Sequence, residues 1–106
     1  MLLILLLVSF SLCAQSTQSN QDDKQQAVFS CLKECKDNPQ NLDYKNGPCL
    51  SDDNPNWNIS DWVCDVAHSP RQTVDDLPEN QCSAFRSGQS HHFVEVDANC
   101  NLIRAV

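Results

Sequence analysis

Oxygen-bearing side chains recur at every second position in one short polar segment of the chain. Asp52, Asn54 and Asn56 follow this spacing, and Asp61 ends the segment. Calcium-binding loops use the same spacing, because a chain that wraps an ion points every other side chain inward. Trp57, however, stands where the EF-hand pattern requires a glycine for its sharp turn. The sequence therefore allows a calcium site here but favours a polar surface loop shaped by Asx turns.

Three imidazoles suggest a second kind of metal chemistry. The histidines are His68, His91 and His92, and imidazole nitrogens bind transition metals. Neighbouring residues of a strand point to opposite faces, so His91 and His92 are poorly placed to share an ion. His68 and Asp65 could form a His–carboxylate pair, but the chain has no nucleophile motif and no glycine-rich oxyanion loop. We therefore predict that the protein is not an enzyme and has no cofactor.

Two tryptophans flank the end of the polar segment. Exposed aromatic side chains anchor contacts with proteins and carbohydrates. Trp57 lies inside the polar segment and is the candidate partner-binding residue, whereas Trp62 begins an apolar segment and is expected in the core. Asn58 begins an Asn-Ile-Ser sequon, which is a glycosylation site only if the protein passes through a eukaryotic secretory route.

The cysteines indicate a disulfide framework. Six of the seven lie beyond residue 30, namely Cys31, Cys35, Cys49, Cys64, Cys82 and Cys100. An even number of cysteines in a short secreted chain implies three bridges. Structural zinc sites favour C-x2-C pairs, which this sequence lacks. Because apolar side chains are scarce outside the N-terminal segment, bridges of roughly 2–4 kcal/mol each are expected to decide whether the chain folds.

The N-terminal segment has the pattern of a secretory leader. Residues 2–8 are all apolar, and the uncharged run that they begin is shorter than the roughly 20 residues that span a bilayer. We therefore predict a signal peptide over residues 1–14 and no membrane span. The alternative is a bacterial lipoprotein signal in which Cys13 carries the lipid, although Leu12 stands where that signal has a small residue.

Length and charge exclude several classes of protein. The chain has 106 residues, 14 acidic against seven basic residues, and a formal net charge of −7. This length fits one domain. The acidic balance argues against nucleic acid and against an anionic membrane surface as partners, and it favours cationic partners.

The elements that would position these residues begin with a helix. Val28, Cys31, Leu32 and Cys35 recur at helical spacing, so the pattern predicts a helix over about residues 23–37. The two cysteines then face the core, and we expect them to bond to later segments and not to each other.

The second half of the chain predicts short elements in the order strand, helix, strand, strand. The expected strands are 62–67, 92–96 and 102–106, the last two joined as a hairpin by a turn over 97–101. A second short helix is expected over about 77–87, with a glycine just beyond its end.

Together these patterns predict a small disulfide-rich α+β fold with three disulfides. Residues 1–14 form the signal peptide, residues 15–26 a flexible polar leader, and residues 27–106 a single cysteine-stabilised domain. We expect a secreted or extracytoplasmic protein that binds an extracellular protein or carbohydrate, as an interaction, effector or inhibitor module. The alternatives are a surface lipoprotein anchored at Cys13 and a small calcium- or transition-metal-binding protein.

Overall fold

The computed structural model describes residues 16–38 and 47–106 of the chain. The predicted signal peptide, with Cys13, lies outside these residues. The helix α1 (Ser16–Asp37) precedes three strands, β1 (Trp62–Val66), β2 (His92–Val96) and β3 (Leu102–Ala105), which form one sheet in the order β1-β2-β3. The predicted α+β class and the three predicted strands are confirmed.

The sheet is mixed. β1 runs parallel to β2, with Trp62 opposite His92 and Val66 opposite Val96. β2 and β3 form the predicted antiparallel hairpin, whose register shifts between Glu95 and Val96. Strands that are parallel begin at the same edge of the sheet, so residues just before β1 and β2 lie side by side.

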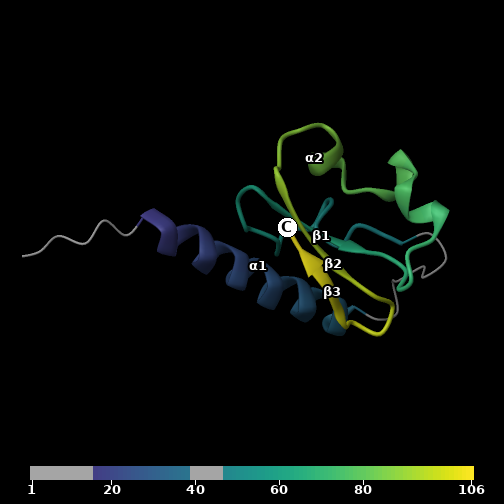
Figure 1. The fold of residues 1–106 in the computed structure, drawn as a ribbon, viewed down its shortest axis with the longest axis horizontal. Helices are drawn as coiled ribbons and strands as arrows, with labels where there is room; N and C mark the ends of the chain where they lie inside the picture. The colour runs from purple at the N-terminus through teal and green to yellow at the C-terminus, as the bar shows by residue number, and fades with distance from the viewer. Residues whose placement is uncertain (1–15, 39–46) are drawn as a thin grey trace, which may run out of the picture.

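The helix α1 covers one face of this sheet, and Figure 1 shows α2 (Ser83–Arg86) on the other side. Two disulfides attach α1: Cys31 bonds to Cys64 of β1, and Cys35 bonds to Cys100 in the turn before β3. The expectation that both thiols bond to later segments is confirmed. The core between helix and sheet consists of Ala27, Cys31, Cys35, Trp62, Cys64, Val66, Val94 and Val96.

The helix begins earlier than the sequence predicts. It starts at Ser16, whereas we expected a flexible leader over residues 15–26 and a helix from about residue 23. Residues 21–26 are exposed, so burial does not explain the extra turns. Once two disulfides fix the C-terminal half, each further residue adds one hydrogen bond without a new nucleation cost, and Gln and Lys are good helix formers.

The predicted helix over 77–87 is not continuous, and this prediction is wrong in its extent. A 3-10 turn, η2 (Thr73–Asp76), precedes the segment, which itself forms a second 3-10 turn, η3 (Pro78–Asn80), followed by the four-residue α2. Cys82 is extended, with φ −57° and ψ 130°, and bonds to Cys49. Its extended backbone interrupts any helix through this position. The end was predicted correctly, since Gly88 follows α2 with φ +81°.

The bridges that attach α1 can be distinguished experimentally from the bridge that does not. Replacing Cys35 and Cys100 together by Ser should cost about 4 kcal/mol, because this bridge closes 65 residues. Amide hydrogen exchange should rise throughout α1, which then keeps one attachment. The control is the double Ser variant of Cys49 and Cys82, which leaves both attachments of α1 in place. Equal loss of α1 protection in the two variants would contradict this assignment.

Candidate functional site: a pocket lined by carboxyl groups and arginines

A small pocket lies on the face of the sheet opposite α1. Alternate residues of a strand point to opposite faces, so the side chains between those of the core line this second face. The cavity volume is about 40 Å³. The lining residues are Val63, Asp65, Arg71, Gln81, Cys82, Phe85, Phe93, Glu95 and Arg104. A cavity of this volume has room for about two or three water molecules.

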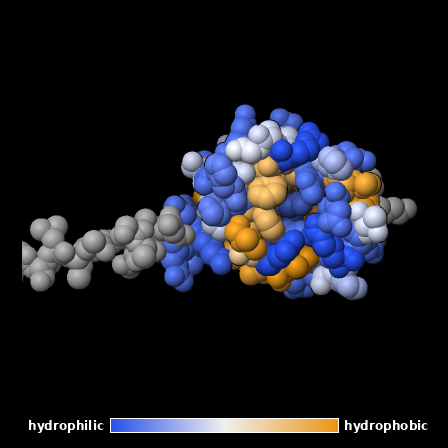
Figure 2. Space-filling model, turned by 45° about the horizontal axis from the view of Figure 1, so that its top comes forward, coloured by the Kyte–Doolittle hydropathy of each residue, from blue (hydrophilic) through white to orange (hydrophobic). Residues whose placement is uncertain are grey.

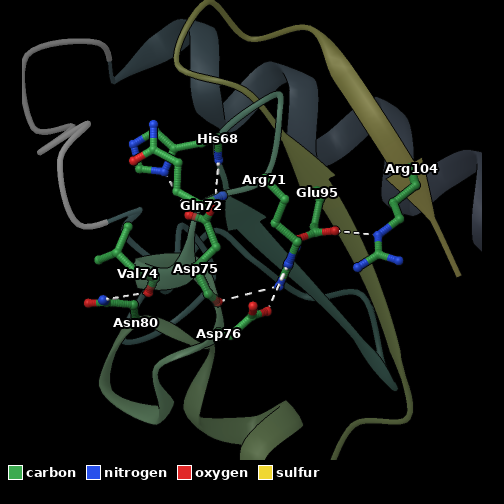
Figure 3. Close-up of polar contacts among 9 residues, drawn as sticks. All are labelled: His68, Arg71, Gln72, Val74, Asp75, Asp76, Asn80, Glu95 and Arg104. Carbon is green, nitrogen blue, oxygen red and sulfur yellow. Dashed lines mark hydrogen bonds and ion pairs between the residues drawn. The ribbon is translucent and has the colours of Figure 1, made fainter.

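Glu95 of β2 lies at the centre of an ion-pair network and is only 2% exposed. Arg104 of β3 donates from Nε to one carboxylate oxygen of Glu95, and Arg71 donates from Nη1 to the other. Figure 3 shows Glu95 between the two guanidiniums. Arg71 also donates from Nε to Asp76 at 2.8 Å and from Nη2 to the carbonyl of Asp75 at 3.4 Å. A buried carboxylate needs partners on both oxygens, and these two arginines supply them.

Asp65 of β1 lies opposite Glu95 in the parallel pair and lacks such partners. Its Oδ1 atom is buried and accepts no hydrogen bond from any described residue. Burial raises the pKa of this carboxyl to about 8, and the charge of Glu95 raises it further, while the charge of Arg71 partly opposes the change. The carboxyl of Asp65 is therefore largely protonated at neutral pH.

A third carboxyl group holds the loop that follows β1. Asp75 is 4% exposed and accepts hydrogen bonds from the backbone N–H groups of His68 and Gln72, at 3.1 and 2.9 Å. Its other oxygen lies 2.8 Å from Nδ1 of His68. Burial opposes ionisation of Asp75, but these hydrogen bonds outweigh it and lower the pKa. The histidine that we considered with Asp65 is thus paired with Asp75, in a structural role.

The oxygen-bearing side chains predicted for calcium make hydrogen bonds within the protein, and their role in binding an ion stays a prediction. Asp52 accepts hydrogen bonds from the backbone and hydroxyl of Ser83, both at 3.0 Å, and so caps the start of α2. Asn54 accepts from the N–H of Asn56 at 2.9 Å, which is the expected Asx turn. Among the histidine, cysteine, aspartate and glutamate side chains of residues 16–38 and 47–106, one group of three comes close enough to share an ion: Cys49, Asp52 and Cys82. Two of its members form a disulfide.

Asp61, the last predicted ligand, contacts both neighbouring histidines. Its Oδ1 atom accepts from the N–H of His91 at 2.9 Å and lies 2.6 Å from Nδ1 of the same residue. Its Oδ2 atom lies 3.6 Å from Nε2 of His92. The hydrogen bonds from His91 lower the pKa of Asp61. Sequence reasoning compared the two histidines with each other and missed the carboxylate that the parallel strands place between them.

The two tryptophans are both packed. Trp62 is 6% exposed, as predicted, and its ring stacks on His92 with centroids 4.7 Å apart. Trp57 is half-buried against the core, and its indole Nε1 donates to the carbonyl of Trp62 at 2.9 Å. The expectation of a freely exposed Trp57 is therefore corrected, while its contact with a partner stays a prediction. Asn58 of the sequon is exposed.

The raised pKa of Asp65 predicts how stability varies with pH. The folded state holds a proton on Asp65 that the unfolded state releases between the ordinary pKa of 3.8 and about 8. The contribution of this group to the free energy of unfolding is therefore present below pH 4 and is lost as the pH rises to about 8. Asp65→Asn should match the wild type at pH 4 and exceed it by at least ~2 kcal/mol at pH 8.5.

Denaturant unfolding at the two pH values measures this difference. Asp23→Asn, which removes an exposed carboxylate of α1, is the control and should follow the wild type at both. Other carboxylates with lowered pKa values affect all three proteins alike, so the comparison isolates Asp65. If the free energy of unfolding varies with pH in the same way for Asp65→Asn and the wild type, the pKa of Asp65 is not raised in the folded protein.

No protein-family model, no curated protein and no solved structure matches this chain. In the part of the chain that the structure describes, no helix is long and apolar enough to cross a membrane.

Proposed function

We propose that this protein is a small secreted, disulfide-stabilised protein that acts by binding an extracellular partner at the pocket around Asp65. The observation that carries the proposal is the buried Oδ1 atom of Asp65, which accepts no hydrogen bond from a described residue. Buried polar atoms in native proteins are nearly always hydrogen-bonded, so an atom left without a partner requires an explanation. A donor supplied by a bound partner would satisfy it.

The disulfides support an extracellular setting for this function. Three bridges join all six cysteines that the structure describes, namely Cys31–Cys64, Cys35–Cys100 and Cys49–Cys82. Such bridges persist in oxidising compartments and are rare in the cytosol. One of them includes Cys82, which lines the pocket, so part of the lining is held covalently.

The lining combines apolar walls with a few charged groups, as ligand sites usually do. Phe85 of α2 and Phe93 of β2 meet edge to face, with ring centroids 5.1 Å apart. Figure 2 shows an apolar band across one face of the molecule with hydrophilic side chains on both sides. Exposed apolar side chains of the second half of the chain include Leu102 and Val106, at 47% and 58%. A partner thus finds an apolar surface as well as the pocket.

The size of the pocket selects the kind of partner. Pockets that enclose a small molecule usually measure about 300–1,000 Å³. The cavity beside Asp65 measures about 40 Å³, which accommodates only the end of a side chain or chain terminus. The partner is therefore a macromolecule that inserts one protruding group and rests the remaining contact area on the surrounding surface.

Two phenylalanines provide a matched test. The mature protein is immobilised, exposed to extracellular medium from its source, and the retained proteins are identified by mass spectrometry. Phe85→Ala removes a pocket wall and should weaken retention at least tenfold, as truncation of a central aromatic contact usually does. Phe29→Ala should leave retention unchanged, because Phe29 is 70% exposed on α1, across the sheet from the pocket.

Thermal melting of both variants shows whether each is folded, and Phe85→Leu replaces Phe85→Ala if the latter melts below the assay temperature. Retention that is the same for all the variants, or lost equally in Phe29→Ala, argues against the pocket as the binding site. If the wild type retains no protein, the proposed function is wrong.

A further inference from the structure

We infer that the pocket receives a primary ammonium group of the partner, with Oδ1 of Asp65 as its hydrogen-bond acceptor. This inference rests on the proposed binding function and names the chemistry of the group that is bound. The ammonium belongs to a lysine side chain or to the α-amino end of a chain, which present the same N–H donors.

The charges around the pocket leave room for one more cation. Two guanidiniums, of Arg71 and Arg104, face four carboxyl groups, of Asp65, Asp75, Asp76 and Glu95. Glu95 takes one donor from each arginine, and Asp76 takes a second donor from Arg71. The Asp75 carboxylate is satisfied by His68 and Gln72, whereas Oδ1 of Asp65 accepts no hydrogen bond from any described residue. The group that completes the cluster must therefore be a donor, and a cationic donor also balances the charge.

Size and aromatic walls favour an ammonium over other donors. The cavity of about 40 Å³ accepts a compact –CH2–NH3+ end more readily than a planar guanidinium with its five N–H groups. Phenylalanine rings attract cations through their faces, and Arg104 already lies over the ring of Phe93 at 5.0 Å from its centroid. An anionic group would meet Asp65 and Glu95, and the arginines that could attract it are already engaged.

Binding should release a proton. The charged groups that face Asp65 are Glu95 on β2, Arg104 on β3, and Arg71 and Asp75 in the segment after β1. Because burial, together with the charge of Glu95, keeps the Asp65 carboxyl largely protonated at neutral pH, the arriving ammonium displaces the carboxyl proton to solvent and then donates to the carboxylate. Affinity should therefore rise about tenfold for each pH unit up to about pH 8.

The experiment titrates the mature protein with three amines while backbone amide NMR shifts are followed. Methylammonium chloride represents a free amine, Nα-acetyl-lysine N-methylamide a lysine side chain, and glycinamide a chain terminus. We expect shifts at Asp65, Phe85 and Phe93, and binding of the best probe about tenfold tighter at pH 7.5 than at pH 6.5. The tightest of the three identifies the source of the ammonium. Nα-acetyl-norleucine N-methylamide, which lacks the amine, should not bind.

Asp65→Asn should weaken binding of the best amine at least tenfold and remove its pH dependence, whereas Asp23→Asn on α1 should change neither. Absence of binding by all three amines, equal binding by Asp65→Asn, or binding by the norleucine analogue would each overturn the inference. The retention experiment with the immobilised protein distinguishes failure of the ammonium inference from failure of the proposed function. If Phe85→Ala loses the retained partner while no amine binds, the proposed function stands and the ammonium inference is rejected. If amines bind while the wild type retains no partner, the pocket binds ammonium groups but the proposed function is rejected.

Discussion

The disulfide between Cys31 and Cys64 is the constraint on which the rest of the structure depends. It fixes the C-terminal half of the helix to the central residue of β1, and both cysteines are fully buried. The Cys49–Cys82 bridge contacts the same residue, because Sγ of Cys49 and Sγ of Cys82 lie 3.6 and 3.4 Å from the carbonyl oxygen of Cys64. The helix, the sheet and the segment that carries α2 are thus joined at one residue, which explains how so few apolar side chains form a core.

This junction divides the sheet into two faces with different chemistry. The side chains that alternate toward α1 are apolar or sulfur-bearing and exclude water. Those that alternate away include Asp65 and Glu95, which the parallel register places directly opposite each other. Had β1 paired one residue out of register, these two carboxyl groups would have pointed to opposite faces. The charge cluster is therefore a consequence of strand register, and the bond of Cys64 to Cys31 turns the other face of β1, which carries Asp65, away from α1.

Local patterns were enough to predict the elements but not their pairing. The helical spacing of Cys31 and Cys35 predicted a helix, and the β-branched and aromatic residues of 92–96 predicted a strand, because each pattern depends on near neighbours in the chain. Six cysteines permit 15 pairings, and nothing in their spacing selects the observed one. The pocket was missed for the same reason. Glu95 appears in a strand as an isolated acidic residue, and its two arginines come from a loop and from another strand.

The departures from prediction also have long-range causes. Cys82 interrupts a segment with good capping signals, because its backbone is not helical at the point where it bonds to Cys49. Trp57 is surrounded in the sequence by polar residues, yet it turns back to donate to the carbonyl of Trp62. In both cases one contact with a distant or returning segment outweighs several local preferences, each of which contributes only about 1 kcal/mol or less.

The same covalent framework explains how the fold tolerates Asp65. A buried carboxyl whose pKa is raised from 3.8 to about 8 destabilises the protein at alkaline pH by several kcal/mol, since each pKa unit corresponds to about 1.4 kcal/mol. A domain with a thin apolar core has little stability to spare. One disulfide contributes roughly 2–4 kcal/mol by restricting the unfolded chain, and this contribution does not depend on how well Asp65 is solvated. Because the bridges act on the unfolded state, the folded face opposite α1 can hold an unsatisfied acceptor in place, ready for a donor from outside.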